Sequence, residues 1–375
     1  MLGTTAKGAA TVKMTRRLGI LAVSVMALLP IAGTWAQEAS PEAVQGKHGQ
    51  VVIGYSAPGL VGAQLEIEQG LVDHAKAKGW KVLTTTSNND PQKQLDDINS
   101  YITQDVDAIV AVPDDSAAIC TAVQAAKDAN IPFYTIDRSP EGCSINMTVL
   151  SDNYLAGKQS AEELVKLLTE RYGSPKGTVL EITGELSQNV AQLRGAGFDD
   201  VMKKQPDIHL IVKTAEKWDS AKAADIVRDV ASSEDTIDAI YMHSDSAYTA
   251  GTIQVLQEIG KLVPRGEDGH VFLAGVDGSP DALQAIRDGN SDQSSNQPIP
   301  DFGLIVNWIE QGLRGEEIKP GPVTEANAMW SPAEVKASDV GPQLFLATTS
   351  VTPANVDDPR LWANILATHS ATPTS

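Results

Sequence analysis

Basic residues are scarce in this chain of 375 residues, which has 29 Lys and Arg against 48 Asp and Glu. Its formal net charge of −19 at pH 7 disfavours partners that are themselves anionic. Nucleic acids and acidic lipid surfaces attract basic patches, which this composition does not favour. We therefore expect no nucleic acid and no anionic membrane surface as a partner.

The sequence also lacks the motifs of common cofactor and catalytic sites. It has no G-x-G-x-x-G after a predicted strand, no G-x-x-x-x-G-K-[ST] and no G-x-S-x-G. Its six histidines are scattered without zinc-ligand spacing, and no calcium-loop pattern is present. His243 precedes Ser244 and Asp245, but neighbours at one strand end point in divergent directions and do not form a triad. We expect no metal, no cofactor and no catalytic residue.

The N-terminal region has the features of a targeting segment. Basic residues within 13–17 precede an apolar run at 18–33, which is followed by Ala36. A basic segment, a short apolar segment and a small residue at the cleavage point are typical of a secretory signal peptide. The run is short for a membrane anchor, and Pro30 interrupts it. We predict that residues 1–36 are removed and that the protein is exported in soluble form.

Cysteine is nearly absent, since Cys120 and Cys143 are the only two. Cys120 is expected on the helix after one strand and Cys143 in the loop after the next, so contact between them is feasible. In an exported protein, such a pair indicates a disulfide. Two free buried thiols are the alternative.

Strand-like apolar runs alternate with helical patterns along most of the chain. They lie at 51–55, 81–85, 108–112 and 133–136, and again at 178–182, 210–214, 239–242 and 271–276. This alternation predicts βαβ units and parallel sheets. The mature chain is long for one hydrophobic core, so we predict two successive three-layer α/β halves.

The fourth strand of the first half ends in an acid and a base. The apolar run that begins at Ile131 predicts a short buried strand, and Asp137 and Arg138 follow it. In an open parallel α/β sheet, ligands bind beyond the carboxyl ends of the strands. Carboxylate acceptors beside guanidinium donors suit a small ligand rich in hydroxyl groups. A surface ion pair is the alternative.

Five short motifs give the chain a wider resemblance, through their order and spacing. They are IPFYTIDR at 131–138, SDNYLAG at 151–157, RGAGF at 194–198, SDSA at 244–247 and AGVDGSPD at 274–281. Over about residues 50–345 the chain resembles periplasmic monosaccharide-binding proteins of the ribose-binding type, the solute receptors of ABC importers. The resemblance implies the type I periplasmic binding protein fold, in which two three-layer α/β lobes with parallel sheets are joined by three hinge crossovers.

The resemblance also implies where the chain passes between the lobes. Crossovers are expected near 151–152, near 297–300 and near 323–326. The N-terminal lobe would comprise 50–151 plus about 300–325, and the C-terminal lobe 152–297 plus about 326–346. Residues 347–375 are expected to form a C-terminal tail.

Ligand contacts follow from the same resemblance, residue by residue. Asp137 and Arg138 match the acid–base pair of the N-terminal lobe, and Arg194 matches an arginine at a helix start of the other lobe. Asp277 matches the aspartate of a Val-Asp-Gly turn, for which a plain helix N-cap is the alternative. Gln297 matches a glutamine at a crossover. Carboxylates accept the hydrogens of sugar hydroxyls, while Arg and Gln donate to the hydroxyl oxygens.

Three more positions define the polarity of the expected site. Trp218 matches an aromatic residue that stacks on the sugar, with packing on the following helix as the alternative. Ser244 stands where relatives commonly carry Asn. At the first strand–helix turn, where ribose-type relatives carry two aromatic residues, this chain has Ala63 and Gln64. The site is therefore expected to be roomier and more polar there, which disfavours ribose and leaves a polyol or another sugar open.

These features together predict an extracytoplasmic, non-enzymatic receptor. Its lobes would close on a monosaccharide or polyol by hinge bending and deliver it to the membrane permease of an ABC importer. The resemblance implies a periplasmic location, and we expect a monomer. A sensory sugar receptor for a membrane kinase or chemoreceptor is one alternative, and an exported sugar-modifying enzyme is another.

Overall fold

The computed structural model of the protein describes residues 43–60 and 62–370. The predicted signal peptide, residues 1–36, lies outside this described part. One compact unit begins at Val44 and contains all the described helices and strands. Among the described residues, no helix combines the length and apolar character that crossing a membrane requires.

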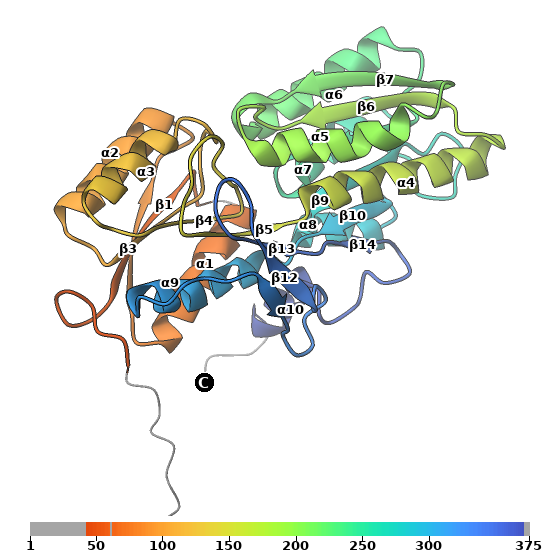
Figure 1. Ribbon diagram of the computed structural model, residues 1–375. Coiled ribbons are helices and arrows are strands. Elements are labelled where there is room, and N and C mark those ends of the chain that lie inside the picture. Colours follow the sequence, from red (N-terminus) through yellow and green to blue (C-terminus); the bar gives the residue numbers. More distant parts are fainter. Residues whose placement is uncertain (1–42, 61, 371–375) are drawn as a thin grey trace, which may run out of the picture. The chain divides into compact units, whose positions relative to one another are not determined.

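An eight-stranded sheet organises the N-terminal lobe (Figure 1). Its strand order is β11-β12-β13-β5-β4-β3-β1-β2. The bounds are β1 Val52–Ala57, β2 Lys81–Thr86, β3 Ala108–Ala111, β4 Phe133–Ile136, β5 Met147–Ser151, β11 Gly321–Val323, β12 Ala333–Lys336 and β13 Gln343–Leu346. Strands β1 to β5 and β13 run parallel, while β12 pairs antiparallel with both its neighbours. The lobe's helices are α1 Ala63–Ala77, α2 Pro91–Thr103, α3 Cys120–Asp128, η2 Ile299–Leu304 and α9 Ile305–Leu313.

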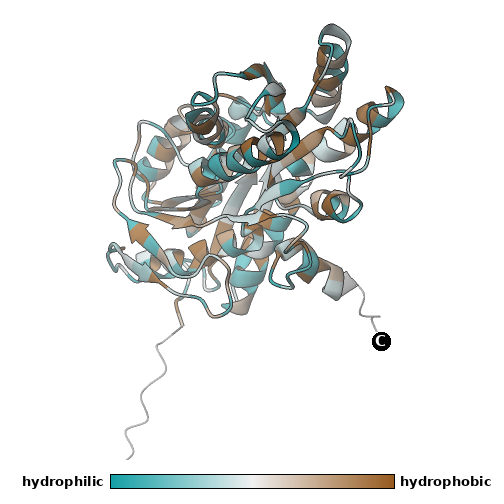
Figure 2. Ribbon diagram, turned by 90° about the vertical axis from the view of Figure 1, so that its right-hand side faces the viewer, coloured by the Kyte–Doolittle hydropathy of each residue, from teal (hydrophilic) through white to brown (hydrophobic). Residues whose placement is uncertain are grey.

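A six-stranded sheet organises the C-terminal lobe, in the order β14-β10-β9-β8-β6-β7. The bounds are β6 Gly177–Thr183, β7 Ile208–Thr214, β8 Ala239–Met242, β9 Phe272–Asp277, β10 Gln293–Asn296 and β14 Thr349–Val351. Its helices are α4 Asn153–Tyr172, α5 Asn189–Met202, η1 Glu216–Trp218, α6 Ser220–Ser233, α7 Asp245–Glu258, α8 Pro280–Arg287 and α10 Trp362–Ser370. Teal and brown stretches alternate along many helices of both lobes, as amphipathic covers of a buried sheet require (Figure 2).

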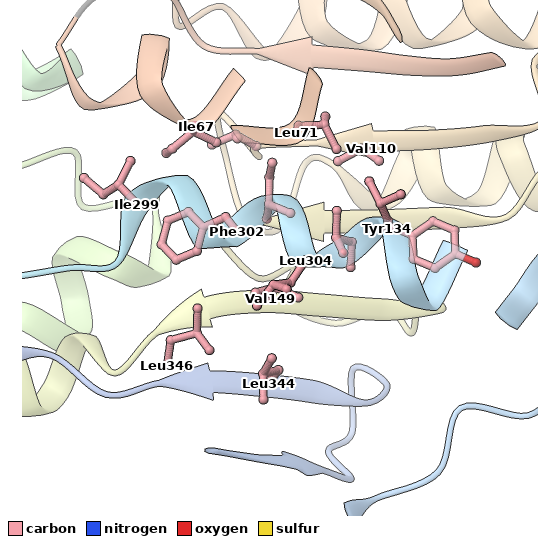
Figure 3. Packing of buried hydrophobic residues seen from close by; sticks show 14 of the residues in the cluster. Ile67, Leu71, Val110, Tyr134, Val149, Ile299, Phe302, Leu304, Leu344 and Leu346 are labelled. Atoms are coloured by element: carbon pink, nitrogen blue, oxygen red, sulfur yellow. The ribbon is translucent and has the colours of Figure 1, made fainter. Parts of the chain in front are cut away.

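The apolar strand runs form the cores. In the N-terminal lobe, Val110, Tyr134 and Val149 of neighbouring strands are fully buried. Figure 3 shows Phe302 and Leu304 of η2 packed over them, beside α1. Burying each large apolar side chain stabilises the fold by about 1.5–3 kcal/mol. The strand ends that carry the polar motifs are therefore held by a rigid core.

The last part of the chain differs from the expectation. Residues 326–346 were predicted to belong to the C-terminal lobe, but β12 and β13 lie in the eight-stranded sheet, where β13 pairs with β5. The prediction is wrong because Leu344 and Leu346 are buried in the N-terminal core. The chain thus passes between the sheets between β13 and β14, at residues 347–348, rather than near 323–326. The expected tail also contains β14 of the six-stranded sheet and α10.

Cys120 and Cys143 form a disulfide with Cα atoms 5.6 Å apart, as predicted. The bond joins α3 to the loop that follows β4 and Asp137, so it closes a loop of 23 residues around one wall of the candidate site.

Replacing both cysteines with serine is expected to lower the free energy of unfolding by about 3 kcal/mol, from the loop-closure entropy of a loop of this length. Urea unfolding of the oxidised wild type and of the double variant measures the difference. Wild type treated with a reductant serves as the control and should match the variant. Equal stability of the variant and the oxidised protein would refute the expected contribution.

Candidate functional site

A cavity of about 350 Å³ lies between the two lobes. This volume is at the small end of the range for ligand pockets, about 300–1,000 Å³. Asp137 follows β4, Ser244 follows β8 and Asp277 ends β9, so the cavity lies beyond the carboxyl ends of strands from both sheets. All eight sequence-predicted ligand residues line it: Gln64, Asp137, Arg138, Arg194, Trp218, Ser244, Asp277 and Gln297.

Asp137 and Arg138 form the charged part of the N-terminal wall. Both are buried, and Arg138 Nε lies 3.5 Å from Asp137 Oδ2. Gln64 Nε2 donates to the same oxygen at 3.0 Å, while Arg138 Nη1 donates to the carbonyl of Pro113 at 3.0 Å. Burial lowers the pKa of Arg138, which Asp137 and Asp114 oppose. The Asp137–Arg138 pair is therefore buried and lines the cavity, which differs from the surface ion pair considered as the alternative.

Arg194 of α5 is held from four directions. Its Nε donates to Asn153 Oδ1 at 2.8 Å, its Nη1 to the carbonyl of His243 at 2.5 Å and its Nη2 to Gln297 Oε1 at 3.1 Å. Its Nη1 also lies 3.4 Å from Asp277 Oδ1. The other end of the Gln297 amide is also bound, since its Nε2 donates to Asn153 Oδ1 at 2.9 Å. Gln297 therefore orients Arg194 as well as lining the cavity.

Two glycines explain how α5 brings Arg194 to this position. A Cβ atom on Gly157 of α4 would collide with the carbonyl oxygen of Arg194, and one on Gly197 of α5 would collide with that of Tyr154. Helices α4 and α5 thus approach each other more closely than larger side chains would allow. Gly157 and Gly197, which belong to two of the sequence motifs, thus allow the close helix packing that places Arg194.

Asp277 collects donors from the C-terminal lobe. Its Oδ2 accepts from the hydroxyls of Ser244 at 2.6 Å and Ser246 at 2.7 Å. Burial raises the pKa of Asp277, while Arg194 opposes the rise. Its φ of 126° is rare for a residue with a side chain, and such strain gathers at functional sites. The neighbouring carboxylate of Asp245 instead accepts from the backbone N–H groups of residues 278 and 279 and fixes the turn.

Trp218 is held by contacts within the C-terminal lobe, one of which connects it to the N-terminal lobe through Gln188. Its Nε1 donates to Gln188 Oε1 at 2.6 Å, and Gln188 Nε2 donates to the carbonyl of Asp114 in the N-terminal lobe at 2.8 Å. The Arg194 guanidinium lies 5.6 Å from the centre of the indole ring. The ring packs on the C-terminal core, as the alternative for Trp218 requires, and it also lines the cavity.

The lobes also contact each other at the rim of the cavity. Ser116 N donates to the carbonyl of Ser187 at 3.1 Å, and the N–H of Asn189 donates to the hydroxyl of Ser116 at 3.1 Å. Asn189 Oδ1 accepts from Ser139 N at 3.2 Å. These bonds join the segments after β3 and β4 of one sheet to the segment after β6 of the other, so they form only when the lobes approach each other.

Sequence reasoning missed several residues of the site. Asn89, Lys217 and Ser246 line the cavity, and Asn153 supports Arg194. Asn89 lies in a polar stretch directly after β2, which is a position that strand-end reasoning could have flagged. Asn153 belongs to the motif SDNYLAG at 151–157, whose residues carry no predicted ligand contact. Nothing in the sequence distinguishes Lys217 from a surface lysine.

A buried pair lies beneath the site. His243 Nε2 is 2.7 Å from Glu181 Oε1, and both side chains are excluded from solvent. Burial raises the pKa of Glu181 to about 8. Burial, followed by the charge of Arg194, lowers the pKa of His243 to about 3. The pair is therefore uncharged overall at neutral pH, in a core that would not tolerate a free charge.

The protein is expected to lose stability as pH rises from 6.5 to 8. Folded Glu181 keeps its proton up to about pH 8, whereas the unfolded carboxyl is ionised above about pH 4.5, which costs roughly 1.4 kcal/mol per pH unit. Below about pH 6.5, protonation of unfolded His243 opposes this trend. Glu181→Gln should reduce the fall in the free energy of unfolding between pH 6.5 and pH 8, as measured by chemical unfolding at both pH values. Glu162→Gln, at an exposed position, is the control and should show the same fall as the wild type. An equal fall in both variants would show that Glu181 does not cause it.

The sequence matches a known protein family over most of its length. Residues 47–315 match the model of a family described as periplasmic binding protein domain. The chain belongs to this family. The predicted resemblance and the predicted fold class are thereby confirmed.

Named relatives of this family member include binding proteins for a sugar and a polyol. The ribose import binding protein of Bacillus subtilis is 29% identical over 257 residues, which cover 68% of this chain and 79% of the relative. The xylitol-binding protein of Mycolicibacterium smegmatis is 28% identical over 262 residues, which cover 69% of this chain and 71% of the relative.

Solved structures share the fold. An ABC transporter solute-binding protein from Bacillus halodurans with bound myo-inositol has a TM-score of 0.70 and 23% identity, covering 83% of this chain and 98% of that one. A galactofuranose binding protein has a TM-score of 0.71 and 22% identity, covering 84% and 99%. These likenesses establish the architecture of the chain.

Proposed function

We propose that this protein is an extracytoplasmic solute receptor that captures a monosaccharide or polyol between its two lobes and delivers it to an ABC import permease. One observation carries the proposal, namely that acid, guanidinium, amide and aromatic groups from both lobes line a single small cavity. The names of the relatives, which include ribose and xylitol binding proteins, agree with it.

The chemistry of the cavity suits hydroxyl groups. Asp137 and Asp277 accept hydrogens, while Arg138 and Arg194 donate to oxygens, so each hydroxyl finds both kinds of partner. Charge-assisted hydrogen bonds of this kind contribute roughly 1.5–3 kcal/mol each. The ring of Trp218 offers an apolar surface to the C–H groups of the ligand.

Binding is proposed to be coupled to closure of the lobes. A ligand that contacts both walls favours the closed form, because the open form offers only one wall at a time. The rim bonds from Ser116 and Ser139 to the C-terminal lobe would form in the same movement. The permease can then distinguish loaded from empty receptor by the distance between the lobes.

The remaining parts of the proposal concern location, assembly and chemistry. The receptor is exported to the periplasm through the signal peptide at residues 1–36, acts as a monomer and leaves its ligand unchanged. N-terminal sequencing of the mature protein tests the cleavage, and sedimentation tests the monomer. Recovery of unaltered ligand after long incubation tests the absence of turnover.

A thermal-shift screen over pentoses, hexoses, deoxy sugars and polyols tests the function itself. Bound ligand stabilises the folded state by RT ln(1 + [L]/Kd), so about 2.7 kcal/mol is expected at 100 times Kd. A deletion strain should fail to take up the compound that stabilises the protein. Normal uptake by that strain would instead favour a sensory receptor, and a screen without any stabilising compound would refute sugar or polyol binding.

A further inference from the structure

The two walls of the cavity differ in chemistry. Trp218 of the C-terminal lobe is the only aromatic residue among the described residues that line the cavity. The facing part of the N-terminal lobe presents Gln64 in the first turn of α1 and Asn89 after β2, beside the Asp137–Arg138 pair. A ligand in this cavity therefore meets charged groups on both sides, with a ring only on the C-terminal side and the amides of Gln64 and Asn89 on the N-terminal side.

The Gln64 amide is held by one hydrogen bond, while its oxygen accepts none from the described residues. Its Nε2 donates to Asp137 Oδ2 at 3.0 Å, which sets the side chain against the cavity wall. Its Oε1 is buried and has no hydrogen-bond partner in the described part of the protein. Arg138 Nε forms no hydrogen bond there either, although it is ion-paired with Asp137 Oδ2 at 3.5 Å. A ligand that carries a hydroxyl group on that side can satisfy the unmet acceptor of Gln64.

Ring sugars and open-chain polyols differ in what they offer to such a wall. A sugar ring carries its hydroxyls mostly around the edge and presents C–H surface above and below, which suits an aromatic residue on each side. Against an amide wall, one of these C–H faces leaves polar protein groups unpaired, a mismatch that binding sites discriminate strongly. An open chain has a hydroxyl on every carbon and rotates about its C–C bonds. Its hydroxyls can thus point to both walls.

We infer that Gln64 is a specificity-determining residue and that the preferred ligand is an open-chain polyol rather than a ring sugar of the same carbon number. This inference rests on the proposed function, because it names the ligand class of the same site. Gln64 selects the ligand with its amide, and Trp218 packs on one side of the carbon chain.

The experiment compares sugars with the alditols made by reducing them. Xylitol and D-xylose, ribitol and D-ribose, and galactitol and D-galactose are titrated by calorimetry into the mature chain. In each pair the carbon number and the configurations of the hydroxyl-bearing carbons correspond, while the ring is lost. For at least one pair the wild type should bind the alditol about tenfold or more tightly than the parent sugar, the scale of one well-placed hydrogen bond.

Substitutions of Gln64 should change the ratio of alditol affinity to sugar affinity according to the side chain introduced. Gln64→Phe, which offers a ring in place of the amide, should weaken alditol binding about tenfold and strengthen binding of the parent sugar. Gln64→Leu, which removes only the amide, should bring the two affinities together. Gln64→Asn keeps an amide and should keep the preference. The matched control is Gln69→Phe on an exposed position of the same helix, outside the cavity, which should leave both affinities unchanged.

The outcomes separate the inference from the function on which it rests. If neither sugars nor alditols bind the wild type, the proposed function fails and the inference fails with it. If, in every pair that binds, the wild type binds the ring sugar as tightly as its alditol or more tightly, the function stands and the polyol preference is overturned. If Gln64→Phe and Gln64→Leu leave the ratio of affinities unchanged, the role of Gln64 is overturned.

Discussion

Asp277→Asn is expected to weaken ligand binding by about 100-fold while the unliganded fold stays at least as stable as the wild type. The loss of affinity follows from the charge-assisted hydrogen bonds that the carboxylate offers, since about 2.7 kcal/mol corresponds to 100-fold. The stability expected of the variant follows from the burial of Asp277, which raises the pKa of its carboxyl. A carboxyl with a raised pKa contributes stability at low pH that is lost as the group ionises, so a neutral amide removes a penalty at pH 7. Arg194 loses its ion pair with residue 277 but keeps its three hydrogen-bond acceptors, so its charge stays solvated by the protein.

Calorimetry and urea unfolding measure the two effects separately. The matched control is Asp225→Asn on α6, whose side chain is 70% exposed and pairs with Arg228 at the surface. This control should change neither affinity nor stability appreciably. Unchanged affinity in Asp277→Asn would remove Asp277 from the ligand site, and a large loss of stability would show that its carboxylate mainly supports the fold.

Arg194→Ala is expected to abolish measurable binding and to lower the free energy of unfolding by about 3–5 kcal/mol, the usual result of breaking a buried charged network. The variant removes the donors to Asn153, Gln297 and the carbonyl of His243. It also leaves the buried Asp277 without its cation. Arg194→Lys should restore the charge but not the binding, because an ammonium group cannot reach several fixed acceptors at once.

Urea unfolding tests this effect on stability. Arg228→Ala is the matched control in the same lobe, since its side chain is 46% exposed and its ion pairs lie at the surface. Arg228→Ala should lower the free energy of unfolding by less than about 1 kcal/mol. If Arg194→Ala were as stable as Arg228→Ala, the four contacts of Arg194 would not form the network described for it.

The parts that sequence could predict are those with strong local patterns. The apolar run before Asp137 identified β4, and the Val-Asp-Gly turn identified the end of β9, so both carboxylates fell at the carboxyl edge of a sheet. The glycines of α4 and α5 have a local signature as well, although their role in placing Arg194 became clear only from the packing.

The parts that sequence could not predict depend on distant partners. Strand β13 has only four residues in a polar, irregular stretch, and it joins the N-terminal sheet because Leu344 and Leu346 fill that core beside β5. Short strands of this kind carry little periodic signal. Lys217 reaches the cavity through the backbone conformation of η1, where its φ is 57°, a local geometry that composition does not indicate.

One calorimetric titration tests the central claim that both lobes contribute to a single ligand site. The compound that stabilises the protein most in the screen is titrated into the wild type and into Arg138→Ala, a change in the N-terminal lobe far in sequence from Asp277. We predict one binding site per chain in the wild type and an affinity about 100-fold lower in the variant, from the loss of charged hydrogen bonds. Equal affinity in the two proteins would place the ligand outside this cavity and contradict the account.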